Sequence, residues 1–277
     1  MPGQALIVDA EGKIDRLQIL EPKTRLACSF ERIYFSRGSD EKIYQERLAL
    51  GYNLSEQVLD SIDHDLKNTK FSFIPNTAEV AFYGLLKGME DYLNRVKVER
   101  ILSWGKDFDE EKLREMITRK IRIEKIAIKD VKMRTFITED ASRNEMVQHV
   151  YDVTYGTIRS GEDTLVVIDD SIVRGTTLRE SIIRMLSRLN PKRIVVVSSC
   201  PQIRYPDCYG IDMSKMGDFI AFNAAVSLTK KKGLNGLMNE LLDRCRALEA
   251  AGALDTVNVV KEFYGHLNHL SFFHKNS

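Results

Sequence analysis

Two runs of aliphatic residues, separated by a helical pattern, constrain the fold of this chain more than any other feature. The first run is Leu165-Val166-Val167-Ile168 and the second is Ile194-Val195-Val196-Val197. Uninterrupted apolar runs of this kind are typical of strands buried on both faces of a parallel sheet. The segment from about Thr177 to Leu189 has helical spacing, and Asn190-Pro191 ends it. The order strand, helix, strand predicts an α/β fold with a central, mainly parallel sheet flanked by helices.

Further elements are expected on the amino-terminal side of this unit. Gly12 supplies the turn of a small hairpin between residues 5–8 and 17–20. Asp40 is the expected N-cap of a helical pattern that reaches Leu66 and has a break at Gly51. The remaining expected elements are a strand at 71–74, a helix over 79–93, an apolar stretch at 126–128 and a helix that reaches Tyr151.

Composition excludes several classes of protein. The chain has 41 Lys+Arg against 40 Asp+Glu, a formal net charge of +1, which argues against a general binder of nucleic acid or of acidic membranes. No segment approaches the roughly 20 apolar residues that span a bilayer. The cysteines at 28, 200, 208 and 245 lack CxxC spacing, so neither a disulfide framework nor a zinc site is predicted. We therefore expect a cytoplasmic protein without nucleic-acid or membrane partners.

The residues directly after the first apolar run carry the chemistry. Asp169 and Asp170 follow the strand at the end where open α/β sheets bind ligands. Two carboxylates at that place can accept hydrogen bonds from ribose hydroxyls or face a hard cation. Gly175 then bends the chain into a helix, whose first N–H groups, with nearby hydroxyls, suit a phosphate. The alternative is that these residues only cap the helix, but the whole pattern predicts a phosphorylated ribose as ligand.

The segment 165–177 resembles the phosphoribosyl pyrophosphate (PRPP) signature of type I phosphoribosyltransferases. The stretch Ser171-Ile172-Val173-Arg174-Gly175-Thr176-Thr177 resembles the glutamine PRPP amidotransferases in particular. Residues 28–37, 134–137 and 203–213 are similar to other segments of that family, in the family's order. The resemblance implies the type I phosphoribosyltransferase fold.

The resemblance also implies a domain organisation. Residues 1–27 would be the remnant of an upstream glutaminase domain and a linker. Residues 28–235 would form the phosphoribosyltransferase domain, with a helical insertion at about 94–125, and 236–277 a helical tail. No residue matches the nucleophilic cysteine of the glutaminase domain, so the chain would use free ammonia. A homo-oligomer is expected, because the family forms dimers and tetramers.

Roles for individual residues follow from the resemblance. Asp169 and Asp170 would hold the ribose hydroxyls and place Mg²⁺, and residues 171–177 would cradle the 5-phosphate. Asn76 and Thr77 would lie on the pyrophosphate side of the ligand. Arg134, at the end of the family's flexible active-site loop, is assigned a catalytic role. The residues that correspond to the lining of the ammonia channel, with core packing as the alternative, are Tyr34, Phe136 and Ile137.

The implied reaction is displacement of pyrophosphate from PRPP by ammonia. It gives 5-phosphoribosylamine and is the first step of de novo purine nucleotide synthesis, with Mg²⁺ as cofactor and purine nucleotides as candidate inhibitors. No iron–sulfur cluster is expected, because the terminal cysteine pair that it requires is absent.

Several positions depart from the family's pattern. Ala78 stands where a hydroxyl is usual, Met133 where a glycine is usual, and Gln148 and Asp152 where Arg and Asn are expected. All of these changes fall on the pyrophosphate side. Two alternatives therefore stay open, namely a diverged PRPP-binding sensor or scaffold without catalysis, and a nucleobase phosphoribosyltransferase. For Cys200 a buried inert thiol is expected, and for His266, His269 and His274 a solvated tail.

Overall fold

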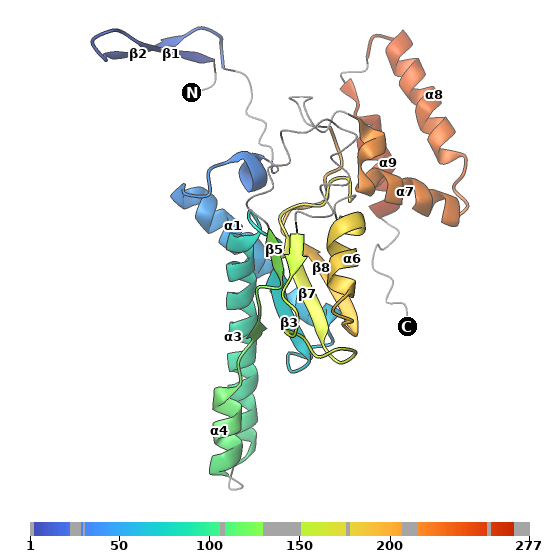
Figure 1. Ribbon diagram of the computed structural model, residues 1–277. Coiled ribbons are helices and arrows are strands. Elements are labelled where there is room, and N and C mark those ends of the chain that lie inside the picture. The colour runs from blue at the N-terminus through green and yellow to red at the C-terminus, as the bar shows by residue number, and fades with distance from the viewer. Residues whose placement is uncertain are drawn as a thin grey trace.

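The computed structural model describes residues 3–22, 29, 31–105, 109–129, 151–175, 178–206, 215–253 and 256–268. A four-stranded sheet with the order β4-β3-β7-β8 lies at its centre, and all three neighbouring pairs are parallel. The strands are β3 (Thr69–Phe73), β4 (Arg122–Ile123), β7 (Thr164–Asp169) and β8 (Arg193–Ser198). The α/β fold with a mainly parallel sheet that the sequence predicts is confirmed, and Figure 1 shows helices on both sides of the sheet.

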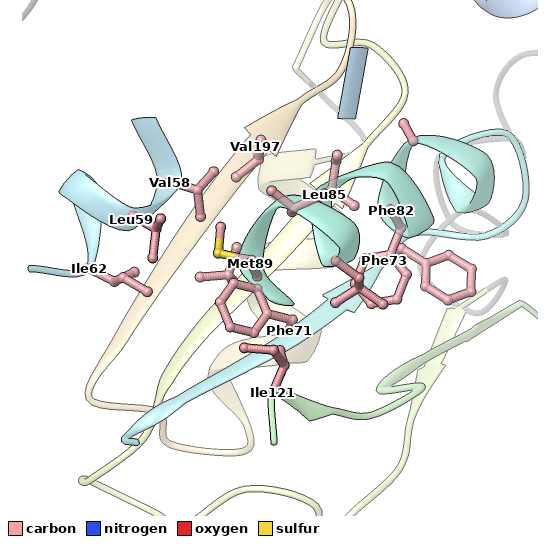
Figure 2. Packing of buried hydrophobic residues seen from close by; sticks show 14 of the residues in the cluster. Val58, Leu59, Ile62, Phe71, Phe73, Phe82, Leu85, Met89, Ile121 and Val197 are labelled. Atoms are coloured by element: carbon pink, nitrogen blue, oxygen red, sulfur yellow. The ribbon is translucent and has the colours of Figure 1, made fainter. Parts of the chain in front are cut away.

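Strand β7 is buried on both faces, which explains its uninterrupted apolar run. Val166 and Ile168 point into one core cluster, which helix α3 (Glu79–Ser103) covers with Phe82, Leu85 and Met89 (Figure 2). On the opposite face Leu165 and Val167 pack against Ile182, Met185 and Leu186. These three residues come from the π-helical turn η3 (Leu178–Ile183) and from α6 (Arg184–Ser187). Because successive strand residues point to opposite faces, each residue of the run packs into the core on one side of the sheet or the other.

Helix α1 (Glu41–Asn53) and helix α3 approach each other closely through glycines. A Cβ atom at Gly84 would lie 2.0 Å from the carbonyl oxygen of Leu48, and one at Gly51 would lie 1.7 Å from that of Ala81. The predicted helix break at Gly51 is therefore wrong: the glycine serves a helix contact, and α2 (Ser55–Ser61) begins later. The predicted cap is confirmed, because the Asp40 carboxylate accepts a hydrogen bond from the Ile43 N–H at 3.0 Å.

Helix α3 continues ten residues beyond the predicted end at Leu93, to Ser103. Helix α4 (Glu110–Thr118) packs beside its second half, and together they form an arm that extends past the sheet (Figure 1). The chain then returns to the sheet as β4, which pairs with β3. The segment 94–125 thus contains the end of α3, α4 and an edge strand.

A separate antiparallel pair, β5 (Ala127–Lys129) with β6 (Tyr151–Val153), follows the arm. Tyr151 is therefore in a strand, and the prediction that a helix reaches it is wrong. Its pairing partner lies more than twenty residues away along the chain, which local spacing cannot reveal. The other residues of that predicted helix lie outside the described part.

The two ends of the described chain carry peripheral elements. The predicted hairpin is confirmed as β1 (Gln4–Val8) and β2 (Ile14–Gln18), with Gly12 in the left-handed region at φ +81°. At the other end lie η4 (Met216–Asp218), α7 (Ile220–Lys231), α8 (Leu237–Ala250) and α9 (Val259–Asn268), which contains His266. In the described residues no helix has the length and apolar character that crossing a membrane requires.

Candidate functional site

The acidic pair lies at the carboxyl edge of the sheet, as predicted. Asp169 is the last residue of β7, and Asp170 follows it. On the neighbouring strand the Ile74 N–H donates to the carbonyl of Ile168 at 2.9 Å, so the 75–77 turn leaves the sheet beside the pair. Asn76 and Thr77 thus share this edge with the two aspartates, in the position where open α/β sheets bind ligands.

Hydrogen bonds fix the backbone of the acidic pair. The Ser199 N–H donates to the Asp169 carbonyl at 3.0 Å, and the Cys200 N–H donates to the Asp170 carbonyl at 2.9 Å. The Ser199 hydroxyl donates to the same Asp170 carbonyl at 3.1 Å. Among the described residues the carboxylates accept hydrogen bonds only from local donors: the Asp170 N–H donates to Asp169 Oδ1 at 2.9 Å, and the Ser171 hydroxyl donates to Asp170 Oδ1 at 3.1 Å. The backbone is therefore held while carboxylate oxygens stay available to a ligand.

The two carboxylates differ from ordinary surface aspartates in their electrostatics. Burial, together with the neighbouring charge of Asp170, raises the pKa of Asp169 to about 7. Among the described residues no Lys or Arg forms an ion pair with either aspartate. Carboxylates without such an ion pair favour a ligand that supplies hydroxyl donors or a cation.

The turn after the pair has the conformation that the sequence predicts for its glycine. Gly175 has φ +71°, and a Cβ atom there would lie 2.6 Å from Cδ1 of Ile220. The Ile220 N–H donates to the Val173 carbonyl at 2.8 Å, which ties the start of α7 to the turn. The turn then enters η3, where the Arg179 N–H donates to the Gly175 carbonyl at 3.0 Å. Left-handed backbone at this point is compatible with glycine and strained for other residues.

The other predicted site residues fall into three groups. Ser171, Ile172 and Val173 are half-buried in the turn, and Arg174 is exposed. Tyr34, in the helical turn η1 (Glu31–Phe35), is 51% exposed, which contradicts its alternative assignment to a core. The residues that lie outside the described part are Arg134, Phe136, Ile137, Thr176 and Thr177, together with Met133 and Gln148.

Two further residues singled out in the sequence, Ala78 and Cys200, are buried. Ala78 is 1% exposed and packs in the core cluster at the start of α3, so its methyl group faces the protein interior. Cys200 is buried with Ile33, Ile203 and Phe219, as expected for an inert thiol.

Arg47 is a residue near the site that the sequence reasoning missed. It lies on α1 and is 6% exposed, and the charge of Asp170 acts on its guanidinium. A signal was present in the sequence: position 47 is four residues after Ile43 and three before Leu50, so it shares their helix face. A charged residue on a buried face calls for a polar partner inside the protein.

The oxygen donors of the acidic pair suit a Mg²⁺ ion that binds together with a phosphate ligand. Among the described residues there is no group of three or more His, Cys, Asp or Glu side chains that could enclose a metal ion. Mg²⁺, however, is commonly bound through one or two carboxylates together with the phosphates of a substrate. Asp169 and Asp170 fit that requirement, because they offer hard oxygen donors next to a turn suited to phosphate.

Comparisons with known proteins agree with this site. No family model matches the sequence. The amidophosphoribosyltransferase of Pseudomonas aeruginosa is 29% identical over 236 residues, which are 83% of this chain and 40% of that protein. The Escherichia coli amidophosphoribosyltransferase is 28% identical over 257 residues, which are 89% of this chain and 44% of that protein. The chain is related to the amidophosphoribosyltransferases. It spans about two-fifths of the length of these relatives.

Solved structures give the same result for the fold. A structure described as the allosteric regulatory enzyme of purine biosynthesis superimposes with a TM-score of 0.55 at 26% identity, covering 84% of this chain and 43% of that one. The Bacillus subtilis glutamine PRPP amidotransferase, complexed with ADP and GMP, gives a TM-score of 0.54 at 26% identity and covers 84% of this chain and 44% of that one. The fold implied by the resemblance to phosphoribosyltransferases is thereby confirmed, and the predicted enzyme class, pentosyltransferase, is that of these relatives.

Proposed function

We propose that this chain binds PRPP with Mg²⁺ and transfers its phosphoribosyl group to ammonia, giving 5-phosphoribosylamine and pyrophosphate. One observation carries the proposal: the acidic pair stands at the carboxyl end of β7 on a fixed backbone, between the 75–77 turn and the glycine turn. The similarity to amidophosphoribosyltransferases over more than four-fifths of the chain supports the same ligand. The activity of the relatives is carried over to this shorter chain as part of the proposal.

Each part of the site has a proposed role in holding the ligand. Asp169 and Asp170 accept hydrogen bonds from the ribose hydroxyls and hold Mg²⁺. The turn 171–177 cradles the 5-phosphate, with the N–H groups of Arg174, Gly175 and Thr176 as donors. Asn76 and Thr77 lie on the pyrophosphate side. This assignment uses the half-buried acidic pair for the ribose and the left-handed turn for the 5-phosphate, which are two chemically different parts of one ligand.

The proposed reaction is a displacement at C1 of the ribose. The lone pair of ammonia forms the N–C1 bond while the C1–O bond breaks, and the electron pair of the C1–O bond leaves with pyrophosphate. The nitrogen, which then carries a positive charge, releases one proton to solvent or to pyrophosphate and gives the amine. Negative charge therefore grows on the leaving group, and fixed N–H donors stabilise it. Mg²⁺, when bound, would neutralise part of that charge. Neutral ammonia needs no base before it attacks, so the chemistry does not require a catalytic histidine, and Arg134 is proposed to act on the leaving-group side.

Ammonia supply and regulation are also carried over as proposals. In the longer relatives an upstream glutaminase domain would deliver ammonia, and we propose Tyr34, Phe136 and Ile137 as lining of its path. Purine nucleotides are proposed inhibitors, since the B. subtilis relative was solved with ADP and GMP. A homo-oligomer and a cytoplasmic location belong to the same proposal.

The experiment is to incubate the protein with PRPP, Mg²⁺ and ammonium chloride and to follow pyrophosphate release. Release that requires ammonium, and that is lost in Asp169→Asn, supports the proposal. Release only on addition of a purine or pyrimidine base would instead indicate a nucleobase phosphoribosyltransferase.

Binding of PRPP without turnover is the second candidate function. Ala78 favours it, because its buried methyl group offers no oxygen where the family usually has a hydroxyl. A calorimetric titration with PRPP and Mg²⁺, run beside the release assay, separates this candidate from an enzyme.

A further inference from the structure

A groove runs between the two helices of the arm, away from the acidic pair. Its volume is about 390 Å³, in the range of small-ligand sites. Helix α3 starts after the 75–77 turn at the carboxyl edge, and its 25 residues extend about 37 Å, roughly twice the length of a five-residue strand. The second half of α3, which forms one wall of the groove, therefore lies past the amino ends of the strands (Figure 1).

The α3 side of the groove combines an aromatic ring with a cation. Val96, Arg100 and Trp104 follow one another at intervals of four residues, so they lie on one face of the helix. Trp104, the C-cap residue of α3, is half-buried and is the only tryptophan of the chain. Arg100 is exposed and forms no ion pair within the described part of the chain. An indole beside a guanidinium without a carboxylate partner suits a ligand that has both a ring and a negative charge.

The α4 side adds two further cations and an apolar side chain. Lys112, Glu115, Met116 and Arg119 occupy positions i, i+3, i+4 and i+7, which is again one helix face. Met116 is buried, at 9% exposed. The ion pairs on this side are long and exposed: Arg119 with Glu115 at 3.6 Å and Lys112 with Asp109 at 3.7 Å. Exposed pairs of this kind are weak, so both cations can turn to an anionic ligand at little cost.

The lining therefore has three cations against one carboxylate, next to an indole ring. Tryptophan stacks on nucleic-acid bases, and Arg and Lys bind phosphate groups. Lys112 and Arg119 are seven residues apart, about 10 Å along the helix, which suits one nucleotide better than a strand. A long polyanion is also disfavoured by the net charge of the chain, which is only +1.

We propose that the groove between α3 and α4 is a binding site for a mononucleotide, whose base stacks on Trp104 and whose phosphates lie between Arg100 and the cations of α4. This site is separate from the proposed PRPP site. The inference does not rest on the proposed function, and it holds whether or not the chain turns over PRPP.

The fluorescence of Trp104 tests the proposal directly, because excitation at the red edge of the indole band selects the only tryptophan of the chain. Titration with ADP is expected to change the emission in a saturable way, with half-saturation below about 1 mM. Adenosine, which lacks phosphate, and inorganic pyrophosphate, which lacks the ring, should each bind at least about tenfold more weakly. No saturable response to ADP, or equal affinity for ADP and pyrophosphate, would overturn the proposal.

Arginine variants test the location of the bound nucleotide. Arg100→Gln should weaken ADP binding about tenfold, because it removes a charge-assisted contact to phosphate. Arg114→Gln is the matched control: it changes an arginine of α4 that does not line the groove and that pairs with Glu110 at 2.7 Å, so the affinity should stay unchanged. Both arginines are exposed, so both variants are expected to fold. Wild-type affinity in Arg100→Gln would contradict the proposal.

Two further titrations exclude other sources of the signal. The ADP response should persist in the Asp169→Asn, Asp170→Asn double variant, since the groove lies away from the acidic pair; its loss there would place the nucleotide at the PRPP site and overturn the proposal. A stronger response to a glutamate-rich peptide than to ADP would likewise overturn it and indicate a groove that docks a protein.

Discussion

Strand β7 has an aspartate at each end, Asp163 buried and Asp169 half-buried, and the two carboxylates have opposite electrostatic surroundings. Asp163, directly before the strand, is 0% exposed and receives two hydrogen bonds from Arg122, at 2.6 and 2.8 Å. Arg159 adds a side-chain bond at 2.6 Å and a backbone N–H bond at 2.8 Å. These partners outweigh burial and hold the pKa of Asp163 well below its usual range.

Asp169, at the other end, has a pKa raised to about 7 and forms no ion pair within the described residues. The comparison separates a carboxylate that the fold neutralises from one whose charge is left for a ligand to satisfy. The amino edge of the sheet therefore contributes stability, and the carboxyl edge holds the candidate site at some cost in stability.

The largest effect is expected at the amino edge. Asp163→Asn leaves two arginines beside a group that cannot neutralise them, so the free energy of unfolding should fall by about 3–5 kcal/mol. Urea unfolding at neutral pH measures this loss. The folded fraction should bind PRPP with unchanged affinity, since the change lies at the far end of β7. A loss below about 1 kcal/mol would show that the network contributes little.

At the carboxyl edge we expect the opposite effect: replacing an aspartate there should raise the stability of the protein. A folded pKa of about 7 means that Asp169 contributes stability below the unfolded value near 3.8 and that this contribution is lost as pH rises through 7. Without metal, Asp169→Asn should therefore stabilise the protein by about 1–3 kcal/mol at pH 8 and much less at pH 5. Thermal melting at both pH values measures the difference. Destabilisation at pH 8 would contradict the raised pKa.

The smallest effect is expected for two glycines, one at each edge of the sheet, which serve as matched controls for each other. Gly175 and Gly161 have nearly the same left-handed φ, +71° and +72°, on either side of β7. Replacing either one by alanine should cost about 1 kcal/mol of stability for the backbone conformation. Only Gly175→Ala should also weaken PRPP binding, because its Cβ atom displaces Ile220 beside the phosphate turn. Equal binding by both variants would exclude the turn from the site.

The sequence predicted what is local in this molecule. The strand at 165–168, the acidic pair after it, the cap at Asp40 and the turn at Gly12 each depend on neighbours within a few residues, and each was found. The predicted break at Gly51 failed because that glycine is explained by a contact with α3, which no local pattern contains.

The features that escaped prediction join distant segments. Arg122 pairs with Asp163 across 41 residues, and Tyr151 becomes a strand residue by pairing with Lys129. Leu50 of α1 and Val173 of the turn pack against the same buried cluster although they are far apart in the sequence. Such contacts depend on tertiary packing, which overrides local preference and leaves weak traces in spacing alone.

The central claim is that Asp169 and Asp170 hold a phosphorylated ribose. Calorimetric titration of PRPP with Mg²⁺ into the wild type and into the Asp169→Asn, Asp170→Asn double variant tests it most directly. We predict saturable one-to-one binding by the wild type and a loss of about hundredfold or more in a double variant that remains folded. Equal affinity in the two proteins would contradict the account.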